Sequence, residues 1–431
     1  MRKVLSILLK NNRLHGYLRR LYGESLEQIK ATSTVELAVG EANPIQGRAS
    51  DFDAMRLNLL VPALSTEHVF GGISTALSFL REAAIAAVDV RIILTEQVAF
   101  SYNDNPSFSD WEIYELKDDD GGGRRVIAAA NRYNQTLAIG PNDYFIATAW
   151  WTAVSAKALQ EQQQVLFNLK SKRKYIYLIQ DYEPGFYPWS SRYALAESTY
   201  HNSENFIAVF NTSILQNFFI NEGYKFFDHF HFEPVLHAGL RPFLPSVATE
   251  RREKKILIYG RPTVARNAFP IIIMALQDWI KNNEISNWQF ISAGETHPPI
   301  ELGKGNQLIS LGKLSIDAYA QELLSTYAGI SLMISPHPSY PPLEMAAFGV
   351  QVITNNYGAK KLSLLSPNIH TVDWASPELI STILTKITSG YQSAPNLNAN
   401  QIIESQFMEN FCNTENAFFP IIRHILSRMQ T

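Results

Sequence analysis

The sequence is poor in cysteine, in long apolar runs and in net charge. Its one cysteine, Cys412, excludes an internal disulfide framework and is typical of a reducing compartment. No apolar run approaches the roughly 18 residues that a transmembrane helix requires. The formal net charge is −3, so bulk electrostatics give no reason to expect a nucleic-acid partner. We therefore expect a soluble, cytoplasmic protein.

Several common catalytic and metal-binding signatures are also missing. The sequence has no G-x-S-x-G, P-loop, C-x-x-C or H-E-x-x-H motif. His229 and His231 would share one face of a strand, but no third ligand follows at metal spacing. Asp118-Asp119-Asp120 contains a D-x-D pattern but runs into three glycines and two arginines, which is typical of a solvated charge run. We expect neither a metal site nor a cofactor.

The first fifty residues differ from the rest of the chain. Apolar residues at near-helical spacing accompany several arginines and lysines within the first thirty positions. Such a basic amphipathic helix can lie on an anionic membrane surface, or it can pack on its own protein. The first reading places the protein peripherally at the inner face of the cell membrane. Residues 32–51 lack clear periodicity, so we assign 1–50 as a helical extension and linker.

From residue 51 the chain alternates apolar strands with helices, and after residue 250 the pattern restarts. The alternation predicts two Rossmann-like domains, 51–250 and 251–405, each with a parallel sheet. The tail, 406–431, is predicted to be helical and able to pack back on the first domain. The predicted strands are 56–61, 90–94, 144–149, 175–180, 205–210, 255–259, 288–293, 308–311, 329–335 and 350–354, and the main helices are 71–82, 268–281 and 315–327.

The segment 329–355 is the most informative part of the sequence. It reads as a strand, a loop, a short helix opened by Pro341-Pro342 and closed by Gly349, and a second strand. A helix that begins at the carboxyl edge of such a sheet favours a bound anion. Glu344 would lie in its first turn, where a carboxylate either binds sugar hydroxyls or only complements the helix dipole.

Other strand ends carry further candidates. Gly71-Gly72 opens a helix and would let the backbone approach a phosphate or sugar, although paired glycines often only permit a tight turn. Arg261 and Lys313 follow two strands of the second sheet. Two cations at one sheet edge can converge on a single anion, and the alternative is a pair of solvated surface charges.

Carboxylates and aromatics concentrate after the fourth strand of the first domain, in the segment 180–189. Asp181 and Glu183 could hold hydroxyls while Tyr182 packs on a sugar ring. The alternative is a proline-rich surface loop whose aromatics pack on the core. Trp150, at another strand end, carries the same ambiguity.

These residues resemble GT-B glycosyltransferases of family 4, the retaining class. The signature of that family is a glutamate, seven further residues and a second glutamate, and it ends in a pattern that Tyr340 to Gly349 matches. In this sequence the position of the first glutamate holds Pro336. That departure puts the common hexose donors in doubt and suits a 6-deoxy sugar. Segments 149–151 and 180–188 further resemble rhamnosyltransferases of bacterial surface polysaccharides and S-layer glycans, which use dTDP-rhamnose.

The resemblance implies two domains facing each other across a cleft and a role for each candidate. Glu344 would bind the nucleoside's sugar, and Arg261 with Lys313 the diphosphate. Asp181 or Glu183 would orient the acceptor hydroxyl or the rhamnose. The implied partners are the nucleotide-sugar donor and an oligosaccharide or lipid-linked glycan acceptor, with no metal. The binding set is completed by Gly71, Gly72, Trp150, Tyr182 and the backbone N–H groups of Ser339 and Tyr340. A nucleotide-sugar epimerase and a non-catalytic glycan-binding protein remain alternatives.

Overall fold

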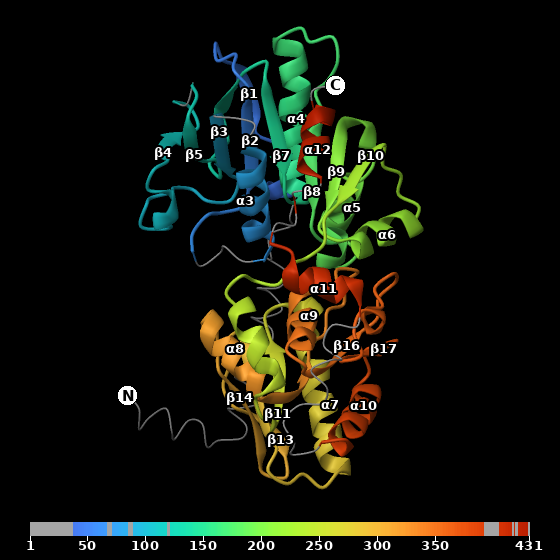
Figure 1. Ribbon diagram of the computed structural model, residues 1–431. Coiled ribbons are helices and arrows are strands. Elements are labelled where there is room, and N and C mark those ends of the chain that lie inside the picture. The colour runs from blue at the N-terminus through green and yellow to red at the C-terminus, as the bar shows by residue number, and fades with distance from the viewer. Residues whose placement is uncertain are drawn as a thin grey trace, which may run out of the picture. The chain divides into compact units, whose positions relative to one another are not determined.

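Two parallel sheets organise the chain, as the α/β pattern predicts (Figure 1). The computed structural model describes residues 38–66, 71–84, 89–118, 121–391, 405–415, 418 and 421–429. Both sheets belong to one compact unit, Asn43–Thr431. The predicted amphipathic helix of the first thirty residues lies outside the described residues, and Gly40–Ala42 forms a 3-10 turn, η1.

The first sheet has eight strands, all parallel, in the order β10-β9-β8-β7-β2-β3-β5-β4. The prediction of a linker over 32–51 is wrong at β1 (Gln46–Ala49), because those residues pair in parallel with β6 (Thr136–Ile139). The sheet strands are β2 (Arg56–Val61), β3 (Asp89–Leu94), β4 (Glu112–Glu115), β5 (Arg124–Ala128), β7 (Asp143–Ala147), β8 (Tyr175–Ile179), β9 (Phe206–Phe210) and β10 (Asp228–His231).

Helices cover both faces of the first sheet because its central strands are apolar on both sides. Along β2, Leu57 and Leu59 pack in one core cluster with α3 (Gly71–Ala83) and α12 (Ile422–Met429). Leu60, of opposite parity, packs in a second cluster with α4 (Trp150–Leu166) and α6 (Ser213–Asn221). A shorter helix, α5 (Ser191–Ser198), follows the β8 loop.

The second sheet has seven strands in the order β13-β14-β12-β11-β15-β16-β17, parallel except for the β13–β14 pair. Its strands are β11 (Glu253–Gly260), β12 (Gln289–Gly294), β13 (Ile300–Gly303), β14 (Asn306–Ser310), β15 (Thr326–Ile330), β16 (Gln351–Asn355) and β17 (Ile369–Val372). One face packs against α7 (Phe269–Asn282) and α10 (Pro377–Ser389). The other packs against α8 (Ile316–Ser325), α9 (Tyr340–Ala347) and α11 (Gln406–Asn413).

The segment after α8 differs from its prediction at three points. The helix ends at Ser325, and β15 runs from Thr326 to Ile330. The chain leaves the sheet before residue 335 because the side-chain amide of Asn355 bonds both the N–H and the C=O of Met333, groups that a longer ladder would use. The helix α9 begins at Tyr340, so Glu344 is its fifth residue and lies in the second turn, not the first.

The C-terminal tail divides between the two domains. Met408 and Phe411 of α11 belong to a core cluster of the second domain. Ile422 and Ile425 of α12 belong to a core cluster of the first domain, where Phe418 also stacks edge-on against Phe79 of α3. The chain therefore returns to the first domain at its end.

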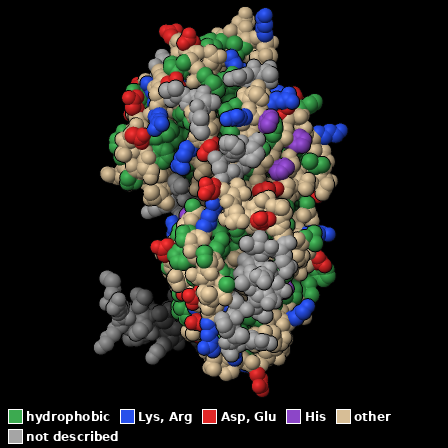
Figure 2. Space-filling view, viewed as in Figure 1, with side chains coloured by type: hydrophobic (Ala, Val, Ile, Leu, Met, Phe, Trp, Pro, Cys, Tyr) green, Lys and Arg blue, Asp and Glu red, His purple; other side chains and the backbone are tan. Residues whose placement is uncertain are grey.

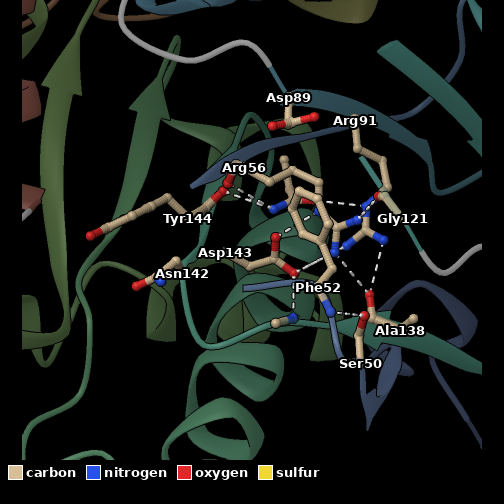
Figure 3. A network of polar contacts seen from close by, with 12 residues as sticks. Ser50, Phe52, Arg56, Asp89, Arg91, Gly121, Ala138, Asn142, Asp143 and Tyr144 are labelled. Carbon is tan, nitrogen blue, oxygen red and sulfur yellow. Dashed lines mark hydrogen bonds and ion pairs between the residues drawn. The ribbon is translucent and has the colours of Figure 1, made fainter. Parts of the chain in front are cut away.

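A buried ion network joins the amino ends of β2, β3 and β7 (Figure 3). Arg56, Arg91 and Asp143 are all 0–1 % exposed. Arg56 donates to both carboxylate oxygens of Asp143, at 2.7 and 2.8 Å, and Arg91 lies 3.5 Å from one of them. This network lies at the opposite end of the sheet from the carboxyl edge. On the outside, acidic and basic side chains are interspersed over the described part of the face shown in Figure 2, in keeping with the small net charge.

Candidate functional site

The loop after β8 meets the loop after β15, so the two domains contact each other through polar side chains. Asp181 is 8 % exposed and accepts a hydrogen bond from the hydroxyl of Ser335 in the second domain. Its other carboxylate oxygen lies 3.7 Å from Nε of Arg266. The guanidinium of Arg266 also covers the ring of Phe186, at 4.4 Å. Asp181 is thus a carboxylate shared between the domains.

His337 lies beside this carboxylate and is held at both ring nitrogens. Nδ1 accepts a hydrogen bond from the backbone N–H of Ser339 at 2.9 Å. Nε2 lies 3.0 Å from the side-chain nitrogen Nδ2 of Asn211 in the first domain. Burial lowers the pKa of His337 to about 4, helped by Lys360 and Arg266 and opposed by Asp181. The imidazole is therefore neutral at physiological pH.

Lys360 completes the group from the loop after β16. It is fully buried, and its ammonium donates to the carbonyl of Met333. Burial lowers its pKa to about 7, although the negative charge of Asp181 acts in the opposite direction. Arg266 thus lies beside the Asp181 carboxylate, and Lys360 is near enough for the charge of Asp181 to act on its pKa.

A second set of residues lies at the carboxyl edge of the second sheet, where β11, β12 and β14 end side by side. Arg261 pairs with Glu295, with Nε and Oε1 3.3 Å apart. Burial would raise the pKa of Glu295, but bonds from Thr263 and Arg261 outweigh it and hold the pKa below its usual value. Lys313 is exposed and follows β14, on the other side of β12. The loops of the two predicted cations therefore lie on either side of Glu295.

Glu344 connects to this set through two tyrosines. Burial raises its pKa to about 7, and the hydroxyl of Tyr319 from α8 partly offsets that rise. Tyr259, the residue before the end of β11, is close enough to Glu344 and Arg261 that both influence its pKa, which burial raises. The structure thus brings Glu344 and Arg261 around Tyr259, as the strand-end argument requires.

The amino ends of α3 and α9 come from different domains and meet through side chains. Burial raises the pKa of Tyr340 to about 12, opposed by a hydrogen bond with Thr75 of α3. Gly72 packs so closely on Gln180 that an added Cβ would lie 3.2 Å from its amide oxygen, whereas no described residue has an atom within 4 Å of a Cβ added at Gly71. The N–H of Ser339, predicted to serve a phosphate, instead donates to His337.

The remaining candidates point into the first domain. Trp150 is 0 % exposed, and its indole N–H donates to the hydroxyl of Tyr187 at 3.0 Å. Glu183 accepts from Tyr177 and Tyr200 at 3.2 and 3.5 Å, and burial raises its pKa to about 8. Tyr182 packs among aromatic rings, with its hydroxyl 3.3 Å from that of Tyr193 and 3.2 Å from that of Tyr224.

Sequence reasoning missed Ser335, His337, Asn211 and Lys360 as site residues. The first two lie in the loop between β15 and α9, and their place at a strand end was a usable signal. Asn211 directly follows β9, so its place at a strand end was a usable signal too. Lys360 gave no signal, because nothing in the local sequence shows that its ammonium turns inward.

Two models of known protein families match the chain, one within each of the two domains. The model described as WsaF, N-terminal domain, matches residues 56–213, and the model described as WsaF, C-terminal domain, matches residues 254–385. Among curated proteins, the O-antigen biosynthesis protein RfbC of Myxococcus xanthus is 31% identical over 235 residues. That match covers 54% of this chain but 17% of RfbC, so the chain spans about a sixth of its relative's length.

Solved structures with the same fold include three with a TM-score above 0.5. Alr3699/HepE of Anabaena, in complex with UDP and glucose, has a TM-score of 0.56 at 12% identity and covers 88% of this chain and 100% of its own. A glycosyltransferase from Rickettsia africae scores 0.53 at 14% identity, with 88% and 98% covered. Sucrose-phosphate synthase from Thermosynechococcus elongatus scores 0.51 at 12% identity, with 87% and 98% covered. At these identities the likeness shows the fold, which is GT-B.

Proposed function

Since the chain carries the N- and C-terminal domains of the WsaF family on a GT-B fold, we propose that it is a glycosyltransferase of surface-glycan assembly. In the reaction we propose, L-rhamnose moves from dTDP-β-L-rhamnose to a growing polysaccharide or S-layer glycan, with retention of configuration. One observation carries the proposal. A buried carboxylate, Asp181, stands between the two domains with Arg266, Lys360 and His337 around it.

The nucleotide end of the donor would occupy the edge of the second sheet. Glu344 would accept hydrogen bonds from the hydroxyl of the deoxyribose, and its pKa near 7 leaves a large share of it ionised at neutral pH. Arg261 and Lys313 would hold the diphosphate, with Arg261 exchanging its present partner Glu295 for phosphate oxygens. These fixed cations would stabilise the negative charge that develops on the departing dTDP.

The sugar would lie nearer the domain boundary. Pro336 stands where the GT-B family 4 pattern has a glutamate, and an apolar ring there suits the methyl group of a 6-deoxy sugar. Among the described residues, no atom lies within 4 Å of the place where a Cβ of Gly71 would stand, which leaves room for a ligand close to the backbone. Asp181 would orient the acceptor hydroxyl or the rhamnose. We propose that no metal takes part, because protein cations serve the diphosphate.

The acceptor in this proposal is an oligosaccharide or lipid-linked glycan. Within the part of the chain that the structure describes, no helix is both long and apolar enough to cross a bilayer. We propose that the protein works at the inner face of the cell membrane, with the basic segment near residues 2–20 as its contact. That segment lies outside the described residues.

Isothermal titration calorimetry with dTDP, UDP and GDP tests the proposal without an assumed acceptor. We expect saturable binding of dTDP with the highest affinity of the three. Preference for UDP or GDP would contradict the donor assignment, and the absence of binding to all three would favour a glycan-binding protein that lacks catalysis. Turnover of dTDP-rhamnose to another nucleotide sugar without acceptor would favour an epimerase.

A further inference from the structure

The first domain has a polar hollow beside the candidate reaction centre. It measures about 280 Å³ and lies between the ends of α5 and α6. Its lining residues are Tyr182, Glu197, His201, Glu222, Gly223 and Tyr224. A second hollow of about 150 Å³ shares His201 with it and extends along α4 toward Asn205. The two hollows are neighbours on the first domain, with His201 lining both.

This hollow is linked to Asp181 by short steps. Tyr182 follows Asp181 in the chain and donates its backbone N–H to the Asp181 carboxylate at 2.8 Å. Tyr357, from the second domain, is near enough to Asp181, Glu222 and Tyr193 that all three act on its pKa. The hollow and the Asp181 carboxylate therefore both lie near Tyr357.

An exposed tryptophan is linked to the hollow through Tyr193 and Tyr182. Trp189 is 93 % exposed and stacks on Tyr193, with ring centroids 5.6 Å apart and planes 3° from parallel. The hydroxyl of Tyr193 lies 3.3 Å from that of Tyr182, which lines the hollow. Tyr193 therefore covers little of the indole ring. The exposed indole is available to an apolar surface such as the C–H face of a sugar ring.

The polar lining selects the charge of the ligand. The hydroxyl of Tyr224 donates to Glu197 at 3.3 Å, and Nε2 of His201 lies 3.5 Å from the same carboxylate. Glu222 lies on the lining as a second carboxylate. Carboxylates accept hydrogen bonds from sugar hydroxyls but repel anions. The combination of an aromatic platform with two carboxylates therefore suits a neutral oligosaccharide and disfavours a phosphorylated or acidic one.

We infer that Trp189, Tyr193, Tyr224 and Glu197 form a subsite for a neutral glycan chain, which holds the acceptor's non-reacting sugars while its end reaches Asp181. The inference rests on the proposed glycosyl transfer for the identity of its ligand. It names the part of the acceptor that the subsite binds, namely sugars behind the reacting one. Its tryptophan determines the preference for long acceptors over single sugars.

Titration of the full-length protein with rhamnotriose tests the subsite directly, with calorimetry and tryptophan fluorescence as readouts and no nucleotide present. We expect saturable binding that Trp189→Ala weakens about tenfold, since an aromatic contact and its buried area are lost. Tyr224→Phe, which keeps the ring but removes the hydroxyl bond to Glu197, should weaken binding by a smaller factor. The matched control is Trp374→Ala in the second domain, at a tryptophan 66 % exposed, and it should leave the affinity unchanged.

Two further measurements separate this inference from the proposed function. All three variants should bind dTDP like the wild type, because the subsite is in the first domain. With dTDP-rhamnose as donor, Trp189→Ala should raise KM for rhamnotriose and leave kcat unchanged. No saturable binding of rhamnotriose by the wild type, or equal affinities of the Trp189→Ala and Trp374→Ala variants, would overturn the subsite. Failure of dTDP binding with intact rhamnotriose binding would instead reject only the proposed donor.

Discussion

Replacement of Arg261 by glutamine removes the positive charge that we assign to the diphosphate. A hydrogen bond to a charged group contributes about 1.5–3 kcal/mol. The lower end applies here, because the side chain is 36% exposed and binding must break its pair with Glu295, at 3.3 Å. A loss of about 2 kcal/mol corresponds to a Kd for dTDP roughly 30-fold weaker. Calorimetry measures this change in Kd directly. The affinity for thymidine should be the same in the variant and the wild type, because thymidine has no phosphate.

The partner variant, Glu295→Gln, gives the opposite result if the reasoning is right. It removes a negative charge beside the diphosphate and frees Arg261, so dTDP should bind about threefold tighter. Arg124→Gln is the control, since Arg124 pairs with Asp110 on the first domain at 3.1 Å with a side chain 61% exposed. Equal dTDP affinities for the wild type and Arg261→Gln would refute the diphosphate assignment. Weaker binding by Glu295→Gln would show that this carboxylate supports the site and does not compete for Arg261.

Three further predictions concern the core, the pH dependence and the reaction centre. Asp143→Ala leaves Arg56 and Arg91 buried without a counter-charge. It should lower the free energy of unfolding, measured by urea denaturation, by about 3–5 kcal/mol. A loss below about 1 kcal/mol would contradict the stabilising role of the ion network. Burial raises the pKa of Glu183 to about 8, so the folded state binds more protons than the unfolded state between about pH 4.5 and 8 and loses stability as pH rises through that window. Glu183→Gln should flatten this slope in thermal melts, and an unchanged slope would count against a buried, protonated Glu183. Ser335→Ala removes the hydroxyl that donates to Asp181 and accepts the backbone N–H of His337. It should lower kcat about tenfold and leave the affinity for dTDP unchanged. An unchanged kcat would show that this contact does not contribute to the reaction.

Much of the fold could be predicted because buried parallel strands are continuous apolar runs. The bounds 56–61 of β2 agree with the prediction. Those of β8 differ from theirs by one residue at one end, and those of β11 and β16 by one or two residues at each end. Short strands at the sheet edges were missed. All but one residue of β4 are exposed, and β13 alternates with only one buried residue, so neither has an apolar run to detect.

The position of a candidate residue could be predicted only where it follows from a strand end, and the roles of these residues stay predictions. Arg261 and Glu344 come together around Tyr259 because parallel strands share one carboxyl edge. The loop after β8 could not be resolved in the same way, since Asp181 turns to the second domain while Glu183 turns to the first-domain core. Lys360 was beyond local reasoning altogether. Its burial depends on how the loop after β16 folds back on Met333.

The central claim is that this two-domain site transfers a sugar from a nucleotide donor. The most direct measurement follows release of dTDP from dTDP-β-L-rhamnose with and without rhamnotriose as acceptor, in the presence of EDTA, with the product's anomeric configuration determined by NMR. We predict acceptor-dependent release that EDTA does not reduce, and a rhamnoside whose configuration matches the donor's. Release independent of acceptor, loss of activity with EDTA, or an inverted product would contradict the account.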